Sequence, residues 1–273
     1  MRKKVLIALV GLTCFMLAGC SAGENGQDNN NNSYVNEEDD MDNNVIQMTD
    51  EEKKILCSIY VNEDRINEGK LYDYQLEALN QFRSANDYLD AKYPGYDFEY
   101  FAFSPISKTS DVTKLEFTID DTENYFTAQL IVEDDEYVIT DNLAGYLLSP
   151  AYEKMLEEKF KTAGLDKFYV NARISGFYGK EVDANTSMDD IFSLGKSMKR
   201  DVEVYVDMPF EDETKKSEVV KTVEEEIRAL NIYGAHSVYF VPGIMDECSS
   251  GDECLEYRKK NRLNFIQFNT FDL

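Results

Sequence analysis

Hydrophobic positions recur with a helical period in the segment 72–93. Positions on one side recur three and four residues apart, at Tyr72, Leu76, Leu79, Phe82, Asn86, Leu89 and Tyr93, and all but Asn86 are apolar or aromatic. That spacing places them on one face of an α-helix, which Pro94 and Gly95 would end. A shorter helix is expected to begin after Thr49, because Thr49 and Glu52 have the spacing of a capping box.

Four segments with strand-like patterns follow this helix. They lie at 98–105, 114–119, 125–133 and 137–140, and polar turn signals separate the last three. A long helix followed by an antiparallel meander predicts an α+β domain over residues 49–148.

From Ser149 onward, the pattern changes to alternating helices and strands. Ser149 and Pro150 are residue types that favour the start of a helix, and Gly164 would end it. Strands are expected at 168–178, 202–206, 237–241 and 264–271, and helices at 187–198, 214–230 and 253–260. We therefore predict an α/β-type second domain over residues 149–273, so that the whole chain is α+β. One continuous sheet through both halves is the alternative.

The first twenty residues have a pattern of their own. A basic head at 2–4 precedes an apolar run over 5–18 that is too short to span a bilayer as a mature helix. The run ends at Leu17, Ala18, Gly19 and Cys20, which together resemble the lipobox of bacterial lipoproteins. The resemblance implies removal of residues 1–19, a diacylglycerol thioether on Cys20 and a location on the outer face of the cell membrane. An ordinary signal peptide that happens to contain a cysteine is the alternative.

Residues 20–48 are predicted to form a flexible acidic, Asn-rich tether. This segment has almost no apolar side chains before residue 45, so it cannot bury enough surface to offset the entropy of ordering. The chain as a whole has 53 acidic and 28 basic residues and a net charge of -25. Such a surface repels nucleic acid. The partners that we predict are the membrane, through the lipid, and a protein or peptide of the cell envelope.

Candidate catalytic residues do not assemble into a complete motif. His236 is the sole histidine, so multi-histidine zinc sites are excluded, and we interpret it as a hydrogen-bonded structural residue. Ser193 and Lys196 match the S-x-x-K pattern of penicillin-binding proteins, but the partner motifs are missing or misplaced. Gly195, Lys196 and Ser197 match only the end of a phosphate-binding loop. The sequence therefore identifies no catalytic residue, no metal site and no cofactor.

Three cysteines remain besides Cys20 and the one in the signal segment. Cys248 and Cys254 enclose a short loop around Gly251, and outside the cytoplasm we predict a disulfide between them. A zinc site formed by this pair with His236 is the alternative, although the spacing departs from a short zinc knuckle. Cys57 is expected to be a buried thiol in the first helix.

Taken together, these patterns favour a lipid-anchored extracytoplasmic protein with a non-catalytic binding or interaction role. A cell-envelope hydrolase and a structural or accessory subunit of an envelope complex are the alternatives. A pocket with convergent polar groups would favour the enzyme, and a broad exposed aromatic patch would favour the interaction protein. The chain has 18 Tyr and 16 Phe but no Trp, which argues against carbohydrate recognition.

Overall fold

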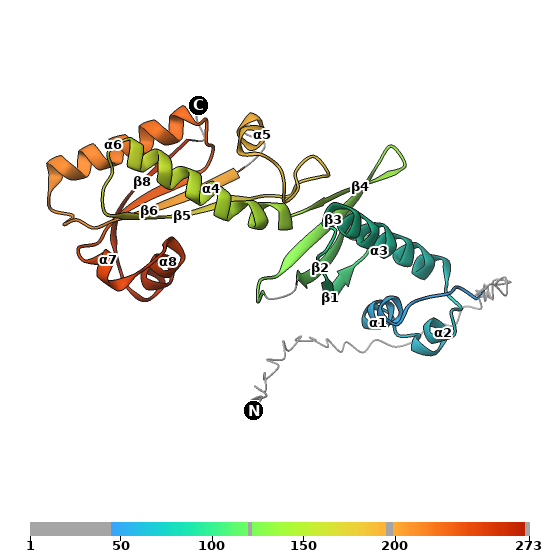
Figure 1. The fold of residues 1–273 in the computed structure, drawn as a ribbon. Coiled ribbons are helices and arrows are strands. Elements are labelled where there is room, and N and C mark those ends of the chain that lie inside the picture. The colour runs from blue at the N-terminus through green and yellow to red at the C-terminus, as the bar shows by residue number, and fades with distance from the viewer. Residues whose placement is uncertain (1–44, 120–121, 195–198, 271–273) are drawn as a thin grey trace, which may run out of the picture. The chain divides into compact units, whose positions relative to one another are not determined.

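The computed structural model describes residues 45–119, 122–194 and 199–270 (Figure 1). The lipobox residues Leu17, Ala18, Gly19 and Cys20 and nearly all of the predicted tether lie outside the described residues. Within the described part of the chain, no helix combines the length and apolar character that a membrane crossing requires.

Three helices open the described chain: α1 (Asp50–Ile59), α2 (Glu63–Asn67) and α3 (Asp73–Lys92). The predicted capping box at the start of α1 is confirmed. The Thr49 hydroxyl accepts from the Glu52 amide at 3.1 Å, and the Glu52 carboxylate accepts from the Thr49 amide at 2.7 Å. The long helix α3 also agrees with its prediction. The five-residue α2 was not predicted, because it is too short to show a helical period.

The first sheet is an antiparallel meander in the order β1-β2-β3-β4, as predicted. Its strands are β1 (Phe98–Ser104), β2 (Thr113–Ile119), β3 (Phe126–Glu133) and β4 (Glu136–Asp141). Alternate side chains of β2, Leu115 and Phe117, are buried in the same core as Leu79 and Phe82 of α3. The apolar face of α3 therefore covers one face of this sheet.

Helix α4 (Leu143–Thr162) begins earlier than the sequence predicts. The prediction that Ser149 starts the helix is wrong, and Pro150 lies inside it. The first turn is instead capped by Asp141, whose Oδ1 atom accepts from the amides of Leu143 and Ala144 at 2.9 and 3.3 Å. A carboxylate in this position satisfies amide donors that have no partner within the helix.

The second sheet has the order β5-β6-β7-β8. Its strands are β5 (Phe168–Ser175), β6 (Lys199–Val206), β7 (Ala235–Phe240) and β8 (Asn264–Asn269). The remaining helices are α5 (Met188–Ser193), α6 (Glu213–Ala229), α7 (Ile244–Glu247) and α8 (Gly251–Lys260). The strands β6 and β7 are parallel and connected through α6, and the two outer strands run antiparallel to their neighbours. The helix α7 was not predicted. The helix α5 ends at Ser193, and the rest of its predicted range from 195 to 198, which contains Gly195, Lys196 and Ser197, lies outside the described residues.

Helices cover both faces of this second sheet (Figure 1). On one face, Val202 and Val204 pack in the core that also holds Leu156 of α4 and Ile227 of α6. On the other face, Tyr205 packs with residues around α7 and α8. An antiparallel sheet followed by alternating helices and strands confirms the predicted α+β class. The predicted domain boundary near residue 148 falls inside α4, and the division into two domains remains a prediction.

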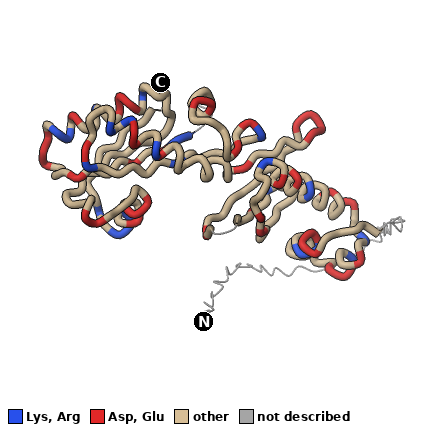
Figure 2. The backbone as a smooth tube through the Cα atoms, viewed as in Figure 1, with Lys and Arg blue, Asp and Glu red and all other residues tan. Residues whose placement is uncertain are grey.

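Acidic residues are spread over helices and turns throughout the described chain, with Lys and Arg between them (Figure 2). This distribution agrees with a solvated acidic surface rather than one concentrated anionic patch.

Candidate functional site

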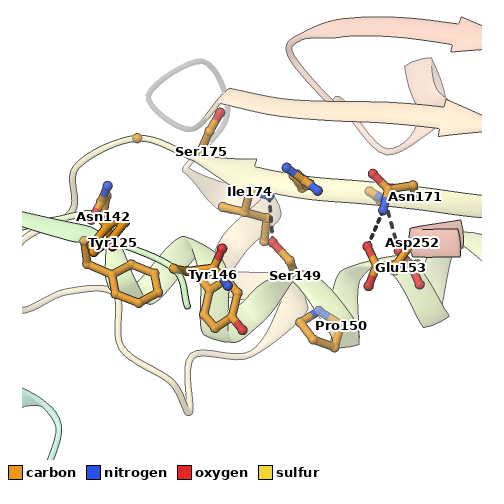
Figure 3. A pocket seen from close by; sticks show the side chains of 15 residues that line it. Tyr125, Asn142, Tyr146, Ser149, Pro150, Glu153, Asn171, Ile174, Ser175 and Asp252 are labelled. Carbon is orange, nitrogen blue, oxygen red and sulfur yellow. Dashed lines mark hydrogen bonds between the residues drawn. The ribbon is translucent and has the colours of Figure 1, made fainter. Parts of the chain in front are cut away.

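A pocket of about 490 Å³ lies beside α4 and β5 (Figure 3). Its walls come from α4, from β5, from the turn before β3 and from the start of α8. The residues that matter most for its chemistry are Tyr125, Tyr146, Glu153, Asn171, Arg173 and Asp252. Figure 3 shows Tyr125 and Asn142 at one end, and Glu153, Asn171 and Asp252 together at the other.

Helix α4 contributes to the pocket from one of its faces. Tyr146, Ser149, Pro150 and Glu153 are spaced three and four residues apart, which places them along one side of the helix. Pro150 has no amide hydrogen, so it cannot donate to the carbonyl of Tyr146 one turn earlier. The pocket therefore lies beside an interior turn of α4 in which one regular backbone hydrogen bond is missing.

Side chains of α4 bond to the outer edge of β5. The Ala172 amide donates to Glu153 Oε2 at 3.2 Å, and the Ile174 amide donates to Ser149 Oγ at 3.0 Å. Ser149 in turn donates to the Gly145 carbonyl at 2.7 Å. These bonds take the place of a neighbouring strand and hold Glu153 against the edge of the sheet.

Two glycines permit this close approach of helices to β5. A Cβ atom on Gly145 would lie 2.4 Å from the Ile174 carbonyl oxygen, and one on Gly251 would lie 1.8 Å from the Val170 carbonyl oxygen. Any larger residue would force α4 or the start of α8 away from the strand. The two glycines thereby bring Glu153 and Asp252 to the same pocket.

Glu153 is the group in this pocket with the most altered acidity. Burial raises its pKa to about 7, and the negative charges of Asp252 and Glu157 act in the same direction, while the bond from the Ala172 amide opposes them. Asp252 accepts from the Asn171 side-chain amide at 2.8 Å. One end of the pocket thus holds two carboxyl groups, one of which titrates near neutral pH.

Aromatic rings form the opposite end of the pocket. Tyr125 is 73% exposed, and its ring lies edge-on to Phe101 with centroids 4.9 Å apart. Tyr146 is also exposed and contacts Phe126, with ring centroids 5.1 Å apart. These two tyrosines offer ring faces and hydroxyl groups to a ligand that enters from solvent.

A second hollow of about 460 Å³ shares Glu153 with the first. It continues along α4 past Glu157 and Lys161, which form an ion pair at 3.7 Å. Ser249 and Gly251, from the loop between Cys248 and Cys254, line this hollow. The cysteine loop therefore borders a cavity, although its thiols do not line it.

The structure places His236 and Ser193 away from both hollows. His236 is buried, its Nε2 atom lies 3.1 Å from the Thr270 hydroxyl, and its ring packs against Phe268. Burial, with the positive charges of Arg228 and Arg200, lowers the pKa of His236 to about 4. Ser193 donates to the Asp190 carbonyl at 2.6 Å at the end of α5. Neither residue lines either hollow.

The three cysteines in the described part of the chain, Cys57, Cys248 and Cys254, are free thiols in the structure. Cys248 and Cys254 are buried and share a hydrogen bond, and burial raises the pKa of Cys254. Their disulfide remains a prediction. Cys57 is half-buried, so it is more accessible than expected. Across the described ranges, no group of three or more His, Cys, Asp and Glu side chains is arranged to hold a metal ion.

The sequence did not identify Glu153, because 53 acidic residues make any single carboxylate inconspicuous. One signal was present. If the helix begins at Leu143, one of its sides faces the following strand. The residues on that side, Tyr146, Ser149 and Glu153, follow a helical spacing. Because the helix was expected to begin at Ser149, this face was not recognised.

Comparison with known proteins adds little. No protein family and no curated protein matches this sequence. A fatty acid AMP ligase from Legionella pneumophila is similar in structure with a TM-score of 0.30 and 10% sequence identity, over 59% of this chain and 32% of the ligase. The chain spans about a third of the length of that ligase, and a likeness at this level supports no inference about fold or function.

Proposed function

We propose that this chain is a lipid-anchored extracytoplasmic lipoprotein with a non-catalytic binding role, and that its ligand is a cationic amino acid or a short peptide that carries one. The proposed anchor rests on the resemblance of Leu17, Ala18, Gly19 and Cys20 to a lipobox. The proposed ligand rests on the pocket beside α4.

The observation that carries the ligand class is the pairing of carboxyl groups with exposed tyrosine rings in one pocket. Glu153 and Asp252 suit an ammonium or guanidinium group, because charge-assisted hydrogen bonds to carboxylates are the stronger ones. The rings of Tyr125 and Tyr146 lie toward the opposite end of the pocket, where they suit a second cationic group of a peptide through its attraction to aromatic faces. Arg173 lines the same pocket and suits a carboxylate, so a ligand with both charges fits better than a simple amine.

The raised pKa of Glu153 gives this binding a dependence on pH. A cation is attracted to the ionised form, so binding should release a proton when the pH is below about 7. Affinity is therefore expected to increase from pH 6 to pH 8. An uncharged ligand would not show this linkage.

The test is calorimetric titration of the full chain in detergent with L-arginine and with L-citrulline, which has the same shape but no guanidinium charge. We expect arginine to bind about tenfold or more tightly than citrulline, and Glu153→Gln to remove most of that difference. Glu157→Gln is the matched control, because Glu157 lies one turn further along α4 and lines only the second hollow. No binding of arginine, lysine or peptides that contain them would contradict the proposed ligand.

The anchor has a separate test. Cys20→Ser removes the sulfur to which the diacylglycerol would attach, so incorporation of labelled fatty acid should be lost. Unchanged labelling of this variant would contradict the anchor and leave the pocket unaffected.

A cell-envelope hydrolase is the second candidate, and one observation favours it. A carboxyl group with a pKa near 7 in a pocket is suited to act as a general acid. Turnover of a peptide or glycan substrate that is lost in Glu153→Gln and kept in Glu157→Gln would favour this function over binding alone.

A further inference from the structure

The two outer strands of the second sheet differ in whether another segment of the chain covers their outward edges. At β5, side chains of α4 bond to the outward amides of Ala172 and Ile174, and Gly145 and Gly251 lie against outward carbonyls. At β8, no hydrogen bond joins the free edge to any described residue. One edge of the sheet is therefore covered and the other is open.

The pairing of β8 with β7 determines which of its backbone groups face outward. The Thr270 amide donates to the Gly234 carbonyl at 3.1 Å, just beyond the end of the ladder. Hydrogen-bonded and non-hydrogen-bonded pairs alternate along an antiparallel ladder. The N–H and C=O groups of Phe265, Gln267 and Asn269 consequently point away from β7.

The sequence of β8 lacks the features that normally protect an outer strand. Natural edge strands carry charges, proline or bulges, or are covered by another segment. The strand Asn264–Asn269 has no charged residue and no proline, although 30% of the chain is charged, and its register with β7 is unbroken. Phe265 is 48% exposed and extends a row of rings through Tyr239, with centroids 5.2 Å apart.

We propose that β8 pairs antiparallel with β8 of a second copy of this chain, with Gln267 at the two-fold axis. In this register the outward backbone N–H and C=O groups of the two copies face each other. Gln267 lies opposite Gln267 of the second copy, and Phe265 lies opposite Asn269 of the second copy. Pairing of this kind forms about six backbone hydrogen bonds. The proposal is independent of the pocket and its ligand.

The side chains of β8 are self-complementary in the same register. On the face that packs toward the main core, Ile266 of one copy lies opposite Phe268 of the other, and both already contact that core. At the two-fold axis, the side-chain amide of Gln267 lies opposite the same group of the second copy. No charged side chain meets another one, which matters because two copies of net charge -25 repel elsewhere on their surfaces. A basic partner peptide would find no opposite charge on this strand.

The first test is sedimentation velocity of the full chain in detergent over a wide range of concentration. We expect a reversible dimer, and Gln267→Pro, which removes the outward amide hydrogen, should weaken it about tenfold or more. Gln267→Lys should weaken it too, because it places two like charges on the axis, and salt should partly restore pairing. Asn185→Lys adds the same charge at an exposed turn and should leave the dimer unchanged.

The second test fixes the register by oxidative crosslinking. Residues in a hydrogen-bonded antiparallel pair have Cα atoms about 5.5 Å apart, which suits a disulfide, so Gln267→Cys should crosslink two copies. Asn264→Cys should not, because the two positions lie about 20 Å apart along the paired strands. A wild-type chain that stays monomeric at every concentration, or a dimer that persists in both Gln267 variants, would overturn the proposal.

Discussion

Lys92 of α3 and Asp141 at the end of β4 form an ion pair that is closed to solvent. Their Nζ and Oδ2 atoms are 2.7 Å apart, and the side chains are 2% and 0% exposed. The hydroxyls of Tyr88 and Tyr93 also donate to Asp141, at 2.8 and 2.7 Å. The same carboxylate caps α4. One buried group thus connects the long helix of the first sheet to the helix that forms the pocket wall.

Asp141→Asn should destabilise the protein strongly. The variant keeps an oxygen for the amide of Leu143 but leaves the charge of Lys92 buried without an anion. Removing one partner of a buried pair costs about 3–5 kcal/mol. The free energy of unfolding in urea would measure this loss. Lys92→Met in the same chain should recover part of it, and additive losses in the double variant would show that the two groups do not interact.

Glu153 and His236 should give opposite dependences of stability on pH. Below about pH 6.5 the unfolded chain protonates His236 while the folded chain, with a pKa of about 4, does not, so stability from this group falls as pH falls. The folded chain keeps the Glu153 proton up to about pH 7 while the unfolded chain loses it near 4.5, so stability from this group falls as pH rises. Between about pH 4.5 and 6.5 the two effects oppose each other.

Single variants should expose each effect in urea unfolding curves measured across that range. In Glu153→Gln, the free energy of unfolding should rise with pH more steeply than in the wild type. In His236→Gln, it should rise less steeply or fall, with a total change of up to about 3 kcal/mol. Glu218→Gln, at an exposed position of α6, is the control and should not alter the slope associated with either group. Slopes identical to the wild type in both variants would contradict this explanation.

Gly145→Ala should loosen the contact between α4 and β5. The new methyl group would lie 2.4 Å from a backbone oxygen, so the helix must move, at a cost of about 1–3 kcal/mol. Ligand affinity should fall as well, because Glu153 moves with the helix. In Gly179→Ala the added methyl meets only the end of the exposed Glu181 side chain, and a change within about 0.5 kcal/mol is expected. An equal loss of stability in Gly145→Ala and Gly179→Ala, measured by thermal or urea unfolding, would contradict a specific role for Gly145.

If the chain is exported as proposed, Cys248 and Cys254 should form a disulfide in that oxidising compartment. The two thiols already share a hydrogen bond, and closing so short a loop should stabilise the fold by about 1–3 kcal/mol. Peptide mapping without reductant should find this crosslink and a free Cys57. Ready alkylation of both thiols in the folded exported protein would contradict the disulfide.

Local signals in the sequence predicted much of the fold. The capping box at Thr49 and Glu52 and the apolar period of α3 depend only on residues within a few turns, and both were predicted well. The start of α4 was not predicted correctly. Its cap, Asp141, is held by Lys92 and Tyr93, which lie about fifty residues earlier, and no local pattern records that contact.

The candidate site could not be predicted from the sequence for a similar reason. The unusual acidity of Glu153 comes from burial against β5, and that burial depends on Gly145 and Gly251 lying against the strand. Neither glycine stands out in the sequence, because each looks like an ordinary helix or turn residue. The chemistry of the pocket is a property of how α4, β5 and α8 meet.

The covered edge of β5 also limits how large an assembly can become. If two copies join through β8, the combined sheet has a β5 strand at each end, and α4 occupies both of those edges through Glu153 and Ser149. No further strand can be added at either end. Growth of this sheet by strand addition must therefore stop at a closed pair, because the same helix that forms the pocket wall prevents the second sheet from extending into an open-ended fibre.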